Sequence, residues 1–145
     1  MKFEESIIID HPVGEVFKFV SNFRSHKKFS RTYKDSKQVT KGTVGLGTEL
    51  YSKEVFLGRS IETSSEVTAF DPNKQFAFKS KSGPFPAEVE YRFEEVGGQT
   101  KVRMIYDVDP GSFFRLGEHY LRPRIEEEVS FSMQQLKKVL ETQMA

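Results

Sequence analysis

The sequence predicts an α+β domain in which a curled antiparallel sheet wraps around a long C-terminal helix. Three observations support this. A strand-like segment precedes two short helical segments, residues 33–109 alternate with a period of two, and the remaining residues return to a helical period. A chain of 145 residues has the length of one domain, so we expect a single unit over residues 1–145.

The N-terminal segment predicts a strand followed by a helix. Lys2–Ile9 ends in a β-branched run and is expected to form the first strand. Pro12 suits the first position of a helix, with His11 or Asp10 as its cap. Apolar residues then recur at helical spacing, which predicts a helix over residues 12–22.

A second, shorter helix is predicted over residues 25–29. Ser25 could cap this helix, and Phe29 would point inward. We expect His26 to lie on its exposed side.

Residues 33–109 predict about six strands, which with the first strand give a sheet of about six or seven. Turn-forming glycines and prolines divide the segment at regular intervals, and the second face of several strands is charged. Val96 to Gln99 reads as a tight hairpin with two central glycines. Four inward faces are expected: Ile61, Thr63, Ser65, Val67 and Ala69; Phe76, Phe78 and Ser80; Val89, Tyr91 and Phe93; and Val102, Met104, Tyr106 and Val108.

One long helix is predicted from Phe113 to Gln143, with Pro123 inside it. Proline removes one backbone hydrogen bond and clashes with the preceding turn. We interpret Pro123 as a boundary, with a cavity mouth before it and packed core after it. The alternative is two separate helices that meet at Arg122 and Pro123. The apolar stripe comprises Phe113, Gly117, Leu121, Ile125, Val129, Met133, Leu136 and Leu140.

Composition excludes several classes of function. With 22 basic and 21 acidic residues the net charge is +1, which argues against a nucleic-acid partner. The chain has no cysteine, so it can form no disulfide or zinc–thiolate site. No apolar run is long enough for stable membrane insertion, and the N-terminus does not resemble a signal peptide, so we expect a cytoplasmic protein.

Four stretches resemble the START-like, helix-grip superfamily, in particular its polyketide cyclase/dehydrase-like branch. They are "IIIDHPVGEVFKFVSNF", "VGLGTEL", "VTAFDPNKQFAF", and "FEEVGGQTKVRMIYDV" with the helix that ends in "LKKVLE". The resemblance covers nearly the whole chain and is carried by turn and core residues rather than by catalytic groups. It implies a helix-grip fold with a hydrophobic cavity between the sheet and the long helix.

Inward-facing polar residues are the best indication of a ligand. Buried hydroxyls need partners, and a cavity with aromatic walls and a few convergent polar groups is typical of a small-molecule site. If Leu50 faces inward, strict alternation places Ser52 and Glu54 inward as well. The alternative is a bulge or an edge strand that turns these residues to water, and a bulge near Gly58 would turn Glu54 outward. The residues expected to bind a hydrophobic or amphipathic ligand, lipid-like or aromatic, are Phe29, Leu50, Ser52, Thr63, Ser65, Phe78, Tyr91, Tyr106, Phe114, Gly117, Tyr120 and Leu121.

Two other functions stay open on the sequence alone. A cyclase- or dehydrase-type enzyme would use the same cavity, with Glu54, His119, Tyr91 or Tyr106 as candidate proton-transfer groups. A protein-interaction module would instead have a filled core and an exposed apolar patch, for which the outward residues Phe56 and Leu57 are candidates.

No metal or cofactor motif is present in the sequence. The histidines lack metal-ligand spacing, and "GTVGLG" (residues 42–47) has the wrong glycine order and position for a phosphate loop. We therefore expect no cofactor, a small molecule as the partner, and a monomer or weak homodimer.

Overall fold

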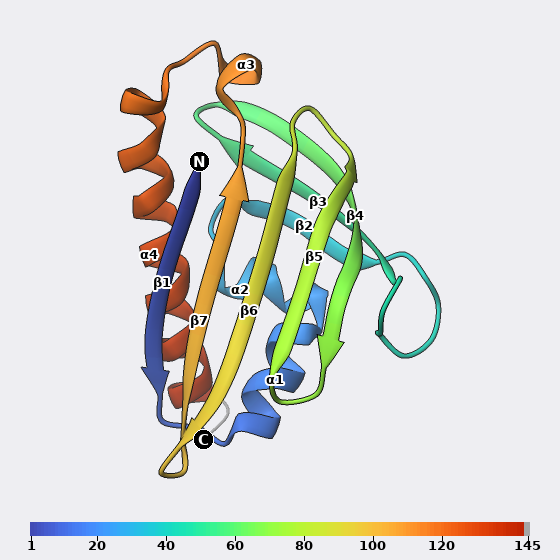
Figure 1. The fold of residues 1–145 in the computed structure, drawn as a ribbon, viewed down its shortest axis with the longest axis vertical. Coiled ribbons are helices and arrows are strands. Elements are labelled where there is room, and N and C mark those ends of the chain that lie inside the picture. Colours follow the sequence, from blue (N-terminus) through green and yellow to red (C-terminus); the bar gives the residue numbers. More distant parts are fainter. Residues whose placement is uncertain (144–145) are drawn as a thin grey trace.

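The structure is a computed structural model that describes residues 1–143. It contains seven strands, four α-helices and one short 3-10 helix, η1 (Figure 1). In chain order these are β1 (Lys2–Ile9), α1 (Val13–Ser21), η1 (Phe23–Ser25), α2 (His26–Phe29), β2 (Tyr33–Gln38), β3 (Glu49–Phe56), β4 (Arg59–Asp71), β5 (Gln75–Ser82), β6 (Ala87–Val96), β7 (Gln99–Val108), α3 (Gly111–Phe114) and α4 (Glu118–Gln143).

The strands form one antiparallel sheet in the order β1-β7-β6-β5-β4-β3-β2. Strands β2 to β7 follow one another as a meander, and β1 joins at the far edge by pairing with β7 from Lys2 opposite Asp107 to Ile9 opposite Thr100. The β6–β7 hairpin turns at Gly97 and Gly98, whose φ angles of 57° and 84° fit a two-residue turn of the left-handed type. The predicted sheet is therefore confirmed.

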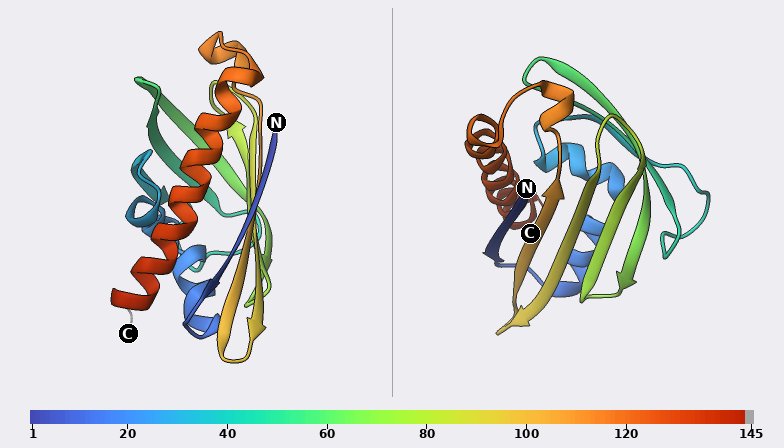
Figure 2. Two further views of the ribbon diagram at one scale, coloured as in Figure 1. Left: turned by 90° about the vertical axis from the view of Figure 1, so that its left-hand side faces the viewer. Right: turned by 45° about the horizontal axis from the view of Figure 1, so that its top comes forward.

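Helix α4 lies across the concave side of the sheet, which α1 and α2 also occupy (Figure 2). It contacts β1 and α2. Each fully buried aliphatic side chain on its inner face contributes about 1.5–3 kcal/mol through the hydrophobic effect. The buried stripe comprises Leu121, Ile125, Val129, Met133, Leu136 and Leu140.

The predicted helix from Phe113 to Gln143 is divided, but not at Pro123. Phe113 belongs to the short helix α3, and Arg115 has a left-handed φ of 56° that ends it. Helix α4 begins at Glu118 and continues through Pro123. Because this proline lies in the second turn, the backbone hydrogen bonds of α4 continue over the twenty residues that follow it.

The N-terminal helices also differ in detail from the prediction. Helix α1 starts at Val13, with Pro12 in the N-cap position and no side-chain cap from Asp10 or His11. The backbone N–H of Asp10 instead donates to Glu141 Oε2 at 2.7 Å. The short helix is a 3-10 turn followed by α2, and Ser25 provides no side-chain cap.

Strand β3 alternates without interruption, which determines which side chains face the helix. Its pairing with β4 runs unbroken from Glu49 opposite Glu66 to Phe56 opposite Arg59. The expected inward position of Glu54 is confirmed, since no bulge near the turn reverses it. The pairing of β4 with β5 has register shifts between Ser64 and Ser65 and between Val67 and Ala69. After the second shift, Phe70 rather than Ala69 packs against the core.

Candidate functional site

A pocket with a cavity volume of about 110 Å³ lies between the concave side of the sheet, α2, α3 and α4. Pockets for drug-sized ligands usually measure about 300–1,000 Å³. This one therefore accommodates a molecule or group about the size of one aromatic ring. Its apolar walls are formed by Phe56, Ile61, Phe78, Phe85, Ala87, Val89, Met104, Val108, Pro110, Phe114, Ile125 and Val129.

Polar side chains enter this apolar pocket from the strands, from the segment before β2 and from α4. The hydroxyls of Ser52, Thr63 and Ser65 come from β3 and β4, as alternation predicts. The segment before β2 adds Ser30 and Thr32, and α4 adds Ser132. These groups can orient a ligand whose affinity comes mainly from apolar contact.

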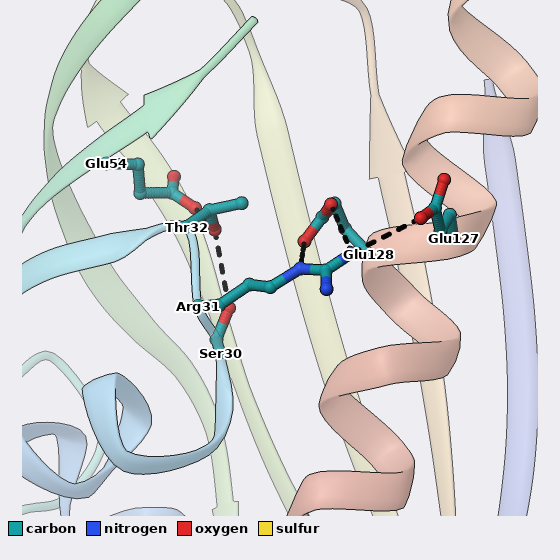
Figure 3. Close-up of polar contacts among 6 residues, drawn as sticks. All are labelled: Ser30, Arg31, Thr32, Glu54, Glu127 and Glu128. Atoms are coloured by element: carbon teal, nitrogen blue, oxygen red, sulfur yellow. Dashed lines mark hydrogen bonds and ion pairs between the residues drawn. The ribbon is translucent and has the colours of Figure 1, made fainter.

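Glu54 is an ionisable residue of this lining, and Figure 3 shows its carboxyl beside Thr32. The hydroxyl of Thr32 donates to Glu54 Oε1 at 3.1 Å. Burial raises the pKa of the Glu54 carboxyl to about 7, although the Thr32 hydrogen bond acts to lower it. A carboxyl with this pKa is partly protonated at neutral pH and can either donate or accept a proton.

Three tyrosines surround the Glu54 carboxyl: Tyr33 on β2, Tyr91 on β6 and Tyr106 on β7. Burial, and then the Glu54 carboxylate, raise the pKa of each phenol well above its usual value, so all three stay protonated. The hydroxyls make no hydrogen bond to another group of residues 1–143, and all three residues line the pocket. They are therefore available to a ligand.

His26 forms another part of the pocket wall, contrary to the expectation that it is exposed. Its Nε2 lies 2.8 Å from the Val20 carbonyl oxygen, which can only accept, so Nε2 carries the proton. Burial lowers the pKa of His26 to about 4, so the ring is neutral at pH 7. The ring stacks on Tyr33 with centroids 6.1 Å apart and meets Tyr91 edge-on at 5.8 Å.

Arg31 joins two walls of the pocket at the protein surface (Figure 3). Its Nε and Nη2 donate to the two carboxylate oxygens of Glu128 at 2.9 and 3.0 Å, and Nη2 also reaches Glu127 at 3.4 Å. The guanidinium lies 4.1 Å from the ring centroid of Phe131. This bidentate pair links the segment before β2, whose Ser30 and Thr32 line the pocket, to α4.

The structure brings most of the predicted site residues together. Those that line the pocket are Ser52, Glu54, Thr63, Ser65, Phe78, Tyr91, Tyr106 and Phe114. Phe29, Leu50 and Leu121 are instead buried in the core cluster outside the lining. Gly117, His119 and Tyr120 are exposed, because they precede or begin α4 beyond the pocket.

The predicted boundary at Pro123 is wrong. Helix α4 contributes Ile125, Glu128, Val129 and Ser132 to the pocket, all of them after Pro123. The segment before Pro123 contributes Phe114 from α3, whereas Leu121 belongs to the core. The pocket therefore lies beside the middle of α4, where the helix passes over the sheet, and not at its N-terminal end.

Phe56 faces the pocket rather than solvent. It packs edge-on against Phe114 with ring centroids 5.6 Å apart, whereas Leu57 at the adjoining turn is exposed. Of the two residues expected to form the patch of a protein-interaction module, Leu57 is therefore exposed and Phe56 is not. The inward position of Phe56 follows from the same alternation that turns Glu54 inward.

Sequence reasoning missed Tyr33, His26 and Glu128 as pocket residues. Tyr33 pairs with Glu54 across β2 and β3, a register that alternation within one strand cannot reveal. His26 precedes Phe29 by three residues, and this helical spacing could have indicated a shared inner face. Glu128 belongs to a run of charged residues in α4, and such a run usually indicates a solvent-exposed helix face. Its pairing with Arg31, which is far away in the sequence, could not be seen there.

Residues 1–143 contain no group of three or more His, Cys, Asp or Glu side chains placed to hold a metal ion. None of their helices is both long enough and apolar enough to cross a membrane.

Comparison with solved structures supports the fold. A protein of Thermus thermophilus is 16% identical over 100% of both chains, with a TM-score of 0.82. The Zhui aromatase/cyclase from a Streptomyces species is 12% identical over 100% of this chain and 96% of its own, with a TM-score of 0.80. A START superfamily protein from Mycobacterium smegmatis is 17% identical over 98% and 95%, with a TM-score of 0.72.

These identities are low, so the structural likeness establishes the fold and not the activity. A search of curated proteins found no significant match. The family profile described as "Polyketide cyclase / dehydrase and lipid transport" matches residues 1–141. Because this match spans nearly the whole chain, the resemblance predicted from the four sequence stretches is confirmed, and the chain belongs to the polyketide cyclase/dehydrase and lipid transport family.

Proposed function

We propose that the protein binds a small amphipathic molecule with an aromatic ring in the pocket around Glu54. The observation that supports this most strongly is the set of three tyrosine hydroxyls without a protein partner, those of Tyr33, Tyr91 and Tyr106, in a pocket with mainly apolar walls. These hydroxyls belong to residues that line the pocket, where a ligand would supply hydrogen-bond partners for them. The cavity volume of about 110 Å³ favours a ring-sized ligand over an extended lipid chain.

A pair of substitutions on β4 tests this proposal. Thr63→Phe would place a ring inside the pocket, and Thr68→Phe would place the same ring at an exposed position of the same strand. With 2-phenylethanol as the probe, calorimetric titration should show saturable binding by the parent and the Thr68 variant and none by the Thr63 variant. Equal binding by both variants would place the ligand elsewhere and refute the proposal.

A second candidate function is proton transfer, and the raised pKa of Glu54 favours it. The Glu54 carboxylate would remove a proton from the carbon beside a carbonyl group, and a neighbouring tyrosine hydroxyl would hydrogen-bond to the enolate oxygen that forms. Return of the proton to the same carbon completes an exchange that needs no further reactant. Cyclisation and dehydration reactions both begin with such a step.

Deuterium exchange measures this step directly. Phenylacetone in D2O should exchange its benzylic protons faster with the protein than with buffer alone, with a rate that rises as the pH passes through about 7. Glu54→Gln should abolish the acceleration, while Glu62→Gln, at an exposed position of β4, should retain it. If the Glu54 variant exchanged as fast as the parent, the enzymatic function would be excluded and the binding function would remain.

A further inference from the structure

The charged side chains that line the pocket all have the same sign. Glu54 and Glu128 belong to the lining, and among residues 1–143 no lysine or arginine does. Glu128 is neutralised by Arg31, which occupies both of its oxygens. Arg59, at the start of β4, is directed away to the carbonyl and ring of Phe113.

Glu54 therefore has no cationic partner inside the pocket. Its Oε1 accepts a hydrogen bond from Thr32, and no other side chain of residues 1–143 donates to the carboxyl. An ionised carboxyl in such a place is unfavourable unless a positive charge or several donors accompany it. A ligand that brings a positive charge would supply what the protein does not.

We propose that the pocket selects a protonated aromatic amine, whose ammonium group pairs with Glu54 while its ring occupies the apolar wall, and that it rejects carboxylates and phosphates of the same shape. This inference rests on the proposed binding function and specifies the ligand class of that site.

The surroundings of Glu54 suit an ammonium group. The rings of Tyr33, Tyr91 and Tyr106 can present electron-rich surfaces to a cation, and their oxygens can accept hydrogen bonds. An ammonium group has three donors, which the free oxygen of Glu54 and two phenol oxygens could satisfy. An anionic ligand would instead meet the Glu54 carboxylate in a pocket whose described lining contains no lysine or arginine, and so would be repelled.

The same groups determine how binding depends on pH. The titratable side chains around Glu54 are Tyr33 from β2, Tyr91 from β6, Tyr106 from β7, His26 from α2 and Glu128 from α4. The tyrosines and His26 are neutral at pH 7, and Glu128 stays paired with Arg31. Glu54 is consequently the group whose ionisation changes between pH 6 and pH 8.

Three ligands of one shape test the selection: 2-phenylethylamine, 2-phenylethanol and phenylacetate, titrated calorimetrically at pH 6, 7 and 8. The amine should bind best and phenylacetate worst. Because the amine prefers ionised Glu54, its affinity should rise about tenfold from pH 6 to pH 8 for a pKa near 7. The alcohol should show no such rise.

The variant Glu54→Gln should remove both the preference for the amine and its pH dependence while the alcohol still binds. Glu62→Gln, which alters an exposed carboxylate on β4, should change neither. Binding of the alcohol without any preference for the amine would overturn this inference and leave the proposed function standing. Failure of all three ligands to bind would overturn both.

A measurement on the parent protein avoids reliance on the folding of any variant. At pH 7, binding of the amine should release about half a proton, because it converts a half-protonated Glu54 to the carboxylate. Titrations in buffers with different ionisation enthalpies give this number directly. An amine that binds without releasing a proton would contradict pairing with Glu54.

Discussion

Glu54 and His26 both lose solvation on folding, and their pKa values move in opposite directions. Burial raises the pKa of the Glu54 carboxyl to about 7 and lowers the pKa of the His26 imidazole to about 4. Both shifts favour the uncharged form. Around neutral pH the pocket therefore contains a neutral imidazole and a carboxyl that is only partly ionised, and a bound ligand can change the ionisation of that carboxyl.

The raised pKa of Glu54 makes stability depend on pH. Between pH 4.5 and about 7 the native protein binds more protons at this site than the unfolded chain, so its contribution to the free energy of unfolding falls as pH rises. In urea titrations the stability of the parent relative to Glu54→Gln should fall by up to about 3 kcal/mol across this window. His26 contributes equally to both proteins, so its opposite effect cancels.

A constant difference between the parent and Glu54→Gln over this pH range would contradict the assignment of a raised pKa. His119→Gln is a useful control in the same titrations, because His119 is exposed and outside the pocket.

Ser36 on β2 is a residue whose substitution should be stabilising. Its hydroxyl is buried and has no hydrogen-bond partner among residues 1–143. Ser36→Ala removes a desolvated polar group and should raise the free energy of unfolding by about 1 kcal/mol. Ser25→Ala should do the opposite, since the single proton of the Ser25 hydroxyl is shared between the Phe19 and Asn22 carbonyl oxygens. Urea midpoints that move the same way for both variants would refute this distinction.

At the scale of elements, α4 both holds the sheet and forms one wall of the pocket. Pro123 lies in its second turn, where the missing N–H leaves the His119 carbonyl without its helical donor. Pro123→Ala restores that hydrogen bond but frees the unfolded chain, which offsets part of the gain. We expect a net stabilisation of about 1–2 kcal/mol in urea denaturation.

The affinity for 2-phenylethanol should not change in Pro123→Ala, because α4 residues line the pocket only from Ile125 onward. Weaker binding in this variant would revive the interpretation of Pro123 as a device that shapes the pocket.

The ion pairs of Arg31 with Glu127 and Glu128 connect the segment before β2 to α4. They should influence the rate of ligand exchange more than the free energy of unfolding. Both Arg31 and its partners reach solvent, where ion pairs contribute little. Arg31→Ala would nevertheless release the segment that contributes Ser30 and Thr32 to the pocket. Stopped-flow measurements should show several-fold faster dissociation of 2-phenylethanol from Arg31→Ala. Dissociation should not change in Arg103→Ala, which removes a surface ion pair between β7 and Glu4 of β1. Equal dissociation rates in Arg31→Ala and Arg103→Ala would show that the ion pairs of Arg31 do not restrict ligand exchange.

Elements with strong periodicity could be predicted from the sequence, whereas those defined by tertiary contacts could not. The alternation of β3 correctly predicted that Ser52 and Glu54 face inward, because the strand has no bulge. The break before α4 was missed because it depends on the left-handed conformation of Arg115, which no residue preference signals. The burial of His26 depends on rings from β2 and β6 that lie far from it in sequence.

At the scale of the whole molecule, the sheet order brings together residues that the sequence separates. Strands β2 and β3 form one end of the sheet, and β6 and β7 lie toward the other (Figure 1). Because the sheet curls around α4, Glu54 from β3 and the tyrosines from β2, β6 and β7 line the same pocket. Burial of a ring there would supply affinity at about 25 cal/mol per Å² of apolar surface, while Glu54 and the hydroxyls determine which ring binds.

Methyl NMR of protein carrying 13C-methyl methionine tests most directly whether this pocket is the binding site. Met104 lines the pocket, whereas Met133, a residue of α4, is fully buried in the core and outside the lining. Titration with 2-phenylethylamine at pH 8 should move the Met104 resonance in a saturable manner and leave Met133 nearly unchanged. A Met104 resonance that stays in place while the amine binds would contradict the account.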